Sequence, residues 1–273
     1  MRMKASVLSS AAESGWKNYE DFADGIDGNR LLSTTHWRGR TLVLALEDQP
    51  SLTLAFQPDD EGLNWQWGKE RGKARVDEVC MDEGLYFFSF LLSPAGGSAP
   101  DSQCLALVIN TLTRRGLAVR CCLQPAGTAG GSRLEQQFMS GTLAGGEVSG
   151  EAPALTRELI GFRALNIYSP NHYYEHFYVN SQRYAWQNLR GEQFGQGDMD
   201  YATYYKFSAD RYLFAFREKI IPVCSVFFFD YPNGRCTGIF MGLDSSGDVK
   251  LRPAGALISK MSFNCYPNGI APL

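Results

Sequence analysis

The sequence has few of the patterns by which catalytic sites are usually recognised. It holds only three histidines in 273 residues, no C-x-x-C pair and no G-x-S-x-G segment. The missing G-x-S-x-G argues against an α/β-hydrolase nucleophile. The glycine pairs at 130–131 and 145–146 lie in loops and are not followed by the lysine of a phosphate-binding loop. We therefore expect neither a serine hydrolase nor a nucleotide-binding loop.

Positive charge is also scarce, which bears on partners. Lys and Arg total 26 against 29 Asp and Glu, giving a net charge of -3, and the longest basic run is Arg114-Arg115. A surface that tracks phosphates needs clustered positive charge, so we expect no nucleic-acid partner. No segment approaches the roughly 20 apolar residues that span a membrane, and the first residues are too polar for an export signal. We expect no membrane partner.

The seven cysteines are odd in number, and most lie within apolar runs. Cysteine in such runs behaves as a small apolar residue, so we expect reduced thiols and a cytoplasmic location. His172 and His176 are four residues apart, which on a strand is about 13 Å. Without a bend that distance is too long for a shared metal ion, and we expect neither a metal nor another cofactor.

An internal repeat is the strongest organisational signal. Leu52 to Trp67 aligns without a gap on Tyr173 to Asn188, matching Trp65 with Trp186. Gln103 to Leu123 aligns on Val223 to Leu243, with Cys104 on Cys224. The offset of about 120 residues and the shared order of strand-like runs predict two copies of one unit.

Each unit has the pattern of an antiparallel β structure. Short runs such as Thr41 to Leu46 are rich in β-branched or aromatic residues and end at turn formers. Asp230 to Gly234 (DYPNG) predicts a hairpin between Cys224–Asp230 and Arg235–Met241. Consecutive strands with almost no helix favour up-and-down barrels, so we predict an all-β protein of two tandem antiparallel β-barrels.

Helix is predicted only near the start of the chain. Trp16, Tyr19 and Phe22 recur on one face of Glu13 to Asp24, as in a helix that closes a barrel mouth or one packed on the outside. We expect four parts: an N-terminal segment with this helix (1–30), a first barrel (31–146), a linker (147–157) and a second barrel (158–273). Gly- and Ser-rich loops are expected at 93–102 and 125–132.

Three segments of the second half resemble a known family. They are Tyr173 to Gly191 (YYEHFYVNSQRYAWQNLRG), Met199 to Phe216 (MDYATYYKFSADRYLFAF) and the DYPNG hairpin. With the tandem barrels they resemble the molybdenum cofactor biosynthesis protein F (MoaF) family. The resemblance implies two calycin-like, lipocalin-like domains and small-molecule binding inside a barrel. The family name further implies a link to molybdenum cofactor biosynthesis or to amine metabolism.

Aromatic residues locate the candidate site. Of the 30 Phe and Tyr, 22 follow residue 160. In the ungapped repeat alignment Leu52, Leu54 and Phe56 predict the inner face of a strand, and their counterparts are Tyr173, Glu175 and Phe177. Either Glu175 lies inside the second barrel, or the register is off by one or Glu175 pairs with an arginine such as Arg163 or Arg183. Tyr184, Trp186, Tyr201 and Tyr205 are also predicted to lie on the inner face of the second barrel. The remaining candidate ligand-binding residues are Tyr212, Arg183 and Arg235.

Three functions remain open from the sequence. The first is a binding protein whose second barrel holds a small hydrophobic or aromatic molecule, while the first barrel is structural. The second is a cofactor-independent acid/base enzyme, of a decarboxylase or isomerase type, acting on an aromatic substrate with Glu175 or His176 and tyrosine hydroxyls. The third is an interaction module with exposed aromatic residues, and an oligomer is left open.

Overall fold

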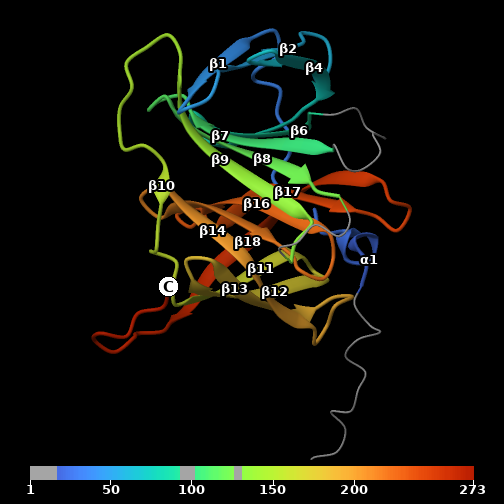
Figure 1. The fold of residues 1–273 in the computed structure, drawn as a ribbon, viewed down its shortest axis with the longest axis vertical. Coiled ribbons are helices and arrows are strands. Elements are labelled where there is room, and N and C mark those ends of the chain that lie inside the picture. The colour runs from blue at the N-terminus through green and yellow to red at the C-terminus, as the bar shows by residue number, and fades with distance from the viewer. Residues whose placement is uncertain (1–16, 93–101, 126–130) are drawn as a thin grey trace, which may run out of the picture.

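The structure is a computed structural model that describes residues 17–92, 102–125 and 131–273. Within these residues it contains eighteen β-strands and one short helix, arranged in two antiparallel sheets that curl into barrels (Figure 1). The all-β, two-barrel prediction is therefore confirmed. The start of the expected helix and most of the two expected Gly- and Ser-rich loops lie outside the described residues.

The first barrel is a nine-stranded sheet in the order β4-β3-β2-β1-β9-β8-β7-β6-β5. It is nearly closed, because the strands at its two ends, β4 and β5, do not pair. Leucine and tryptophan side chains fill its interior, among them Leu54, Leu107 and Trp65. Its strands are β1 (Thr41–Leu46), β2 (Leu52–Phe56), β3 (Gly62–Trp67), β4 (Glu70–Arg75), β5 (Asp77–Asp82), β6 (Leu85–Leu91), β7 (Gln103–Asn110), β8 (Arg115–Leu123) and β9 (Leu134–Leu143).

The second barrel is a closed ring of eight strands. Pairing runs from β11 through to β18, and β18 pairs back with β11. β16 and β17 form the predicted hairpin around the DYPNG turn. Its strands are β11 (Phe162–Ser169), β12 (His172–Asn180), β13 (Arg183–Arg190), β14 (Gly197–Ser208), β15 (Arg211–Arg217), β16 (Val223–Asp230), β17 (Arg235–Leu243) and β18 (Val249–Phe263), and the short β10 (Ala154–Leu155) adds to β14.

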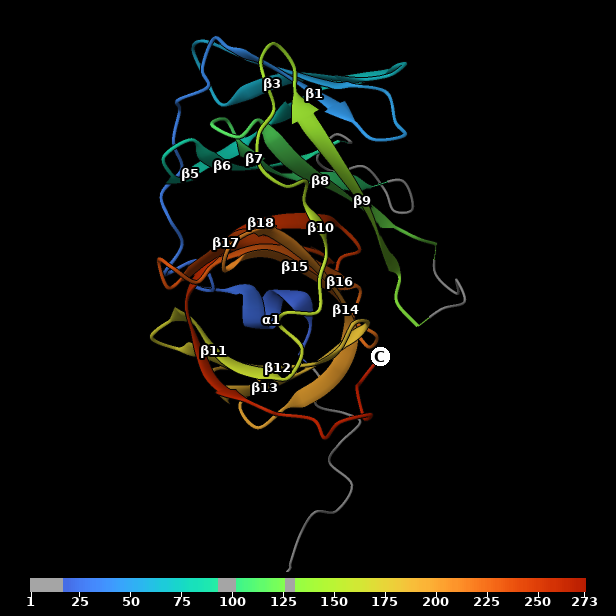
Figure 2. The ribbon, with the colours of Figure 1, turned by 90° about the vertical axis from the view of Figure 1, so that its left-hand side faces the viewer.

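The helix α1 (Tyr19–Ala23) lies inside the mouth of the second barrel, not the first (Figure 2). Of the two sequence interpretations, the helix that closes a barrel mouth is the one observed. Tyr19, Phe22 and Ile26 are each at most 3% exposed and belong to the same apolar cluster as the interior of the second barrel. Which barrel the helix enters could not be predicted from the sequence.

The segment after α1 crosses to the first barrel and is held there by two carboxylates. Arg30 contacts both carboxylate oxygens of Asp77, at 2.7 and 2.8 Å. Glu78, which is 4% exposed, accepts hydrogen bonds from the Thr34 hydroxyl at 2.7 Å and from the His36 amide at 2.8 Å. The N-terminal segment thus contacts both barrels.

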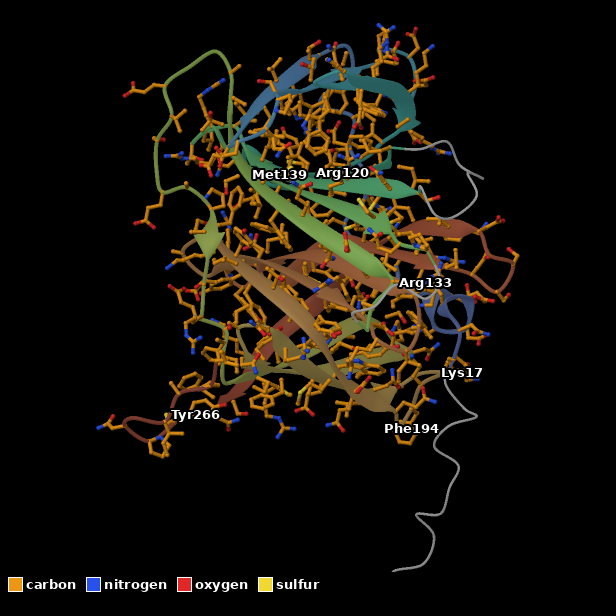
Figure 3. All side chains as sticks on the ribbon, viewed as in Figure 1. Lys17, Arg120, Arg133, Met139, Phe194 and Tyr266 are labelled. Atoms are coloured by element: carbon orange, nitrogen blue, oxygen red, sulfur yellow. The ribbon has the colours of Figure 1, made fainter. Side chains whose placement is uncertain are left out.

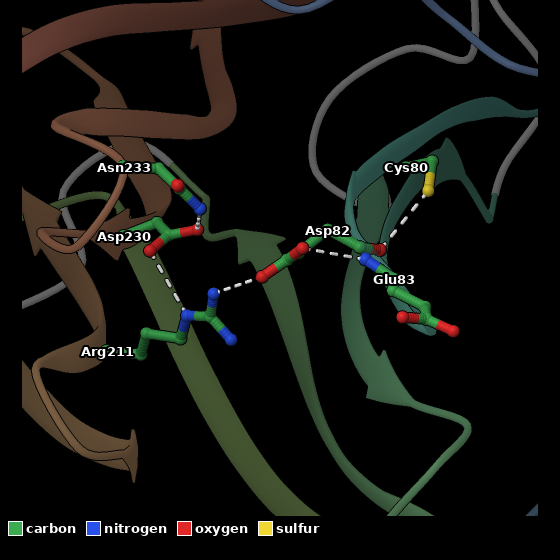
Figure 4. A network of polar contacts seen from close by, with 6 residues as sticks. All are labelled: Cys80, Asp82, Glu83, Arg211, Asp230 and Asn233. Atoms are coloured by element: carbon green, nitrogen blue, oxygen red, sulfur yellow. Dashed lines mark hydrogen bonds and ion pairs between the residues drawn. The ribbon is translucent and has the colours of Figure 1, made fainter.

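The two barrels pack against each other through the outer faces of their sheets. Cys121 and Val119 of β8 share one buried cluster with Cys224 and Ile239 of the second barrel. At its edge Arg211 bridges the two barrels, pairing with Asp82 of the first and, at 3.1 Å, with Asp230 of the second (Figure 4). In the described part of the chain, no helix is long and apolar enough to cross a membrane.

Candidate functional site

The interior of the second barrel is aromatic, and the candidate site lies in it. Alternate residues of each strand point inward, because successive side chains of a strand face opposite sides of the sheet. On β12 and β13 the inward positions include Tyr174, His176, Tyr178, Tyr184 and Trp186, all at most 8% exposed. The aromatic excess of the second half is therefore largely an interior feature of one barrel.

A difference of one residue in a hairpin decides which side chains of β12 point inward. In the first barrel Leu54 pairs with Trp65, and in the second barrel His176 pairs with Trp186. The counterpart of Leu54 is therefore His176 and not Glu175. The second hairpin is one residue shorter, and a slip of one residue moves every side chain of the strand to the other face.

The prediction that Tyr173, Glu175 and Phe177 point into the barrel is accordingly wrong. Glu175 lies opposite Gln187 on the outer face and accepts a hydrogen bond from its amide. It also pairs with Arg163 at 2.6 Å, as the alternative interpretation allowed. Burial favours a higher pKa for Glu175, but the hydrogen bonds from Arg163 and Gln187 outweigh it and lower that pKa. Glu175 is thus an outer-face carboxylate stabilised in its charged form.

The inward placement predicted for Tyr201 and Tyr205 is also wrong, because the other set of alternating residues on β14 points into the barrel. Their neighbours Ala202 and Tyr204 pair with Phe216 and Phe214 of the interior. Two other candidates, Arg183 and Arg235, also lie on the outer face. Arg183 stacks over the Tyr201 ring at 3.8 Å, and Arg235 lies opposite Leu257. Tyr173 is likewise covered from outside by Arg190 at 4.6 Å, and Tyr205 stacks on Phe138 of the first barrel at 5.1 Å.

Four of the candidates are interior residues. His176, Tyr184 and Trp186 meet at one small cavity. Tyr212 also points inward, but it does not line that cavity and instead donates a hydrogen bond to Glu158 at 2.8 Å. The structure thus brings three of the predicted residues together.

The cavity lies between the barrel wall and α1 and measures about 30 Å³. That volume holds about two water molecules, whereas sites for small molecules usually measure roughly 300–1,000 Å³. Phe22 and Ile26 form one side of it. The other lining residues are Tyr168, Tyr174, His176, Tyr184, Trp186, Gln193, Phe216, Glu218 and Phe240.

Glu218 is the functional candidate that the sequence interpretation missed. It follows Phe216 by two residues at the end of β15 and lines the cavity. Among the described residues its carboxyl group makes no hydrogen bond or ion pair. Glu218 is half-buried. This burial raises the pKa of its carboxyl group well above the usual range, and the nearby Asp200 and Asp198 raise that pKa further. The alternation of Tyr212, Phe214 and Phe216 was the signal that could have placed it inside.

Asp200 lies beside Glu218. Tyr201 of β14 lies opposite Arg217 of β15, and because the two strands are antiparallel, Asp200 and Glu218 come next to each other at the end of this pairing. Asp200 is 1% exposed and accepts hydrogen bonds from the Trp186 indole at 2.9 Å and from the Lys219 amide at 3.0 Å. Burial raises the pKa of Asp200, and these donors offset part of the rise. Two carboxyl groups therefore lie together at the aromatic end of the interior.

His176 adds a buried polar group without a partner. It is 4% exposed, and its Nδ1 atom makes no hydrogen bond within the described residues. Burial lowers the pKa of His176 to about 3, so the ring is neutral at neutral pH. A neutral imidazole offers one donor and one acceptor to a bound molecule. No three His, Cys, Asp or Glu side chains of the described chain are arranged to hold a metal ion.

Comparisons with known families identify both halves of the chain. The model of the MoaF N-terminal domain matches residues 14–124, and that of the MoaF C-terminal domain matches residues 153–263. Protein MoaF of Klebsiella aerogenes is 42% identical over 248 residues, covering 86% of this chain and 90% of the relative.

Solved structures offer only weak likenesses. A putative β-lactamase from Burkholderia vietnamiensis has a TM-score of 0.34 at 13% identity, covering 40% of this chain and all of that one. The β chain of DNA polymerase III from Streptococcus pneumoniae has a TM-score of 0.12 at 9% identity, covering 81% of this chain and 77% of that one. Both scores are too low to support a common fold.

Proposed function

The chain belongs to the MoaF family, and from that premise we propose that its second barrel binds a small hydrophobic or aromatic molecule that carries a positive charge. The observation that carries this proposal is the carboxyl group of Glu218, which lies on the wall of an aromatic cavity and has no hydrogen-bond or ion-pair partner among the described residues. The link to molybdenum cofactor biosynthesis or amine metabolism rests on the family name and stays a prediction.

The chemistry of the cavity wall supports a cationic ligand. Aromatic faces attract cations through the ring quadrupole, and the attraction grows when water is excluded. Tyr174, Tyr184 and Trp186 supply such faces, and no lysine or arginine of the described residues lines the cavity. A cation beside Glu218 would relieve the repulsion between that carboxylate and Asp200, so binding favours the ionised form of Glu218.

A second candidate is the acid/base enzyme, with Glu218 in the position that the sequence interpretation gave to Glu175. The observation that favours it is the position of Glu218 on the cavity wall, where burial and the nearby Asp200 and Asp198 raise the pKa of its carboxyl group in the direction that a general acid requires. His176 and the Tyr184 hydroxyl could orient a substrate there. Incubation with aromatic acids and amines, followed by chromatography for a product, separates this enzyme from a binding protein.

The binding proposal is tested with three probes of one size: benzylamine, benzyl alcohol and benzoate. Isothermal titration calorimetry should show that benzylamine binds the most tightly. A hydrogen bond to a charged group contributes about 1.5–3 kcal/mol, so Glu218→Gln should weaken benzylamine binding roughly 10- to 100-fold and leave benzyl alcohol unchanged. Glu175→Gln on the outer face is the matched control and should change neither affinity. No binding of benzylamine, or equal binding of benzoate, would refute the proposal.

A further inference from the structure

We propose that α1 occupies the ligand position of the second barrel and opens the site by swinging outward about the segment before Asn29, with Gly25 as its hinge. This inference rests on the proposed function, because it concerns access to the same cavity. The cavity of about 30 Å³ is too small for an aromatic ring while Phe22 and Ile26 form one side of it.

Phe22 lies where an aromatic ligand would lie. Its ring packs edge-on against Phe240 at 6.2 Å and against Tyr19 at 5.7 Å, and its side chain is 3% exposed. Removing Phe22 and Ile26 from the barrel would join their volume to the existing cavity. The wall that a ligand would then meet is the one that carries Glu218 and His176.

The base of the N-terminal segment is anchored firmly to β11. The Asn29 amide donates to the Tyr168 carbonyl at 2.7 Å, and the Asn29 side chain donates to the Ile167 carbonyl at 2.9 Å. Gly28 lies so close to β11 that a Cβ atom there would be 2.9 Å from Ser169 Cβ. Residue 29 is thus a fixed point.

The helix itself is held by few polar contacts. The Tyr19 hydroxyl donates to the Phe240 carbonyl at 3.2 Å, and the Ser245 amide donates to Glu20 at 3.1 Å. Lys17 pairs with Glu192 at 3.5 Å through exposed side chains, beside the loop that carries Phe194 (Figure 3). Exposed pairs contribute little, so the closed position depends mainly on buried apolar contacts.

Gly25 is suited to act as the hinge. Its φ of +73° is in the left-handed region, which a side chain disfavours. A residue with a Cβ atom at this position would weaken the closed position and increase the open fraction by roughly tenfold. Gly39, with a φ of +70° in the loop before β1, gives a matched control with the same strain away from the site.

Hydrogen exchange with mass spectrometry on the full chain tests the movement. With saturating benzylamine, the amides of residues 19–26 should exchange at least tenfold faster, while the Asn29 amide stays protected. Unchanged or slower exchange at 19–26, with benzylamine bound, would overturn the inference and leave the proposed function intact. Absence of benzylamine binding would instead count against the proposed function.

A second measurement needs no ligand. In Phe216→Cys, the rate of modification by a small cationic methanethiosulfonate reports opening of the cavity, because Phe216 lines it. Adding Gly25→Ala should increase this rate about tenfold, and adding Gly39→Ala should not. Equal rates with and without Gly25→Ala would overturn the inference. If Phe216→Cys does not fold, exchange of residues 19–26 in Gly25→Ala and Gly39→Ala alone gives the same comparison.

Discussion

His176 should make the second barrel sensitive to mild acid. Burial lowers its pKa from the usual 6.5 to about 3 in the folded protein. Between these two values the unfolded chain binds a proton at this residue that the folded barrel does not. The free energy of unfolding must therefore fall as pH drops below 6.5.

The size of the effect follows from the two pKa values. At pH 5 the loss amounts to about 2 kcal/mol, because each unit corresponds to about 1.4 kcal/mol and pH 5 lies about 1.5 units below the unfolded pKa. His176→Gln removes this dependence. Its unfolding free energy should fall by about 2 kcal/mol less than that of the wild type between pH 7.5 and pH 5.

Pulse proteolysis in urea with mass spectrometry is the suitable assay, because it follows peptides of each barrel separately. Tyr184→Phe is the matched control: it changes an interior polar group that does not titrate in this range and should keep the wild-type pH dependence. If the wild type and His176→Gln lose the same stability between pH 7.5 and pH 5, His176 is accessible to water, and its assignment as a buried neutral ring is refuted.

Three further predictions concern packing. Asn166 is fully buried, and neither its amide nitrogen nor its amide oxygen is hydrogen-bonded within the described chain. Asn166→Leu should therefore stabilise the second barrel by about 1–3 kcal/mol in urea unfolding, and a loss of stability would show that the amide has a partner. A double-mutant cycle on Phe138 and Tyr205, which stack at 5.1 Å across the barrels, should give a coupling energy of about 0.5–1.5 kcal/mol, and zero coupling would contradict the stacked geometry. Gly238→Ala would place a Cβ atom 2.2 Å from the Val226 carbonyl oxygen and should cost about 3 kcal/mol or more in thermal unfolding; a neutral result would show that the strands can separate.

More of the fold than of the candidate site could be predicted from the sequence. Short strand-like runs and the DYPNG turn predicted the strands and the barrels, because local patterns determine them. The inner face of β12 depended on the length of one hairpin, which individual residue types do not reveal. The ungapped alignment therefore made Glu175 the counterpart of Leu54. In the structure the equivalent position in the second barrel is His176, because it lies opposite Trp186 as Leu54 lies opposite Trp65. On β13, where the ungapped alignment holds, Tyr184 and Trp186 were correctly predicted to face inward.

Glu218 was missed, and the barrel that α1 enters was not predicted, for a different reason. The inward direction of Glu218 follows from alternation along β15. Its importance depends on its position in the cavity wall and on the buried Asp200 of another strand. The position of α1 in the second barrel depends on buried contacts such as that between Tyr19 and Phe240, which are 221 residues apart. No local pattern in the sequence predicts contacts of that range.

The position of α1 has a consequence for the order in which the protein is assembled. During synthesis α1 is made before either barrel, yet Ser245, which it contacts, is made 225 residues later. At roughly 5–20 residues per second, this segment waits roughly 10–45 s for its partner strands. Tyr19 and Phe22 are exposed on the nascent chain throughout that time, and the first barrel can form while the segment waits. The part of this protein that is translated early is thus among the last to reach its native position.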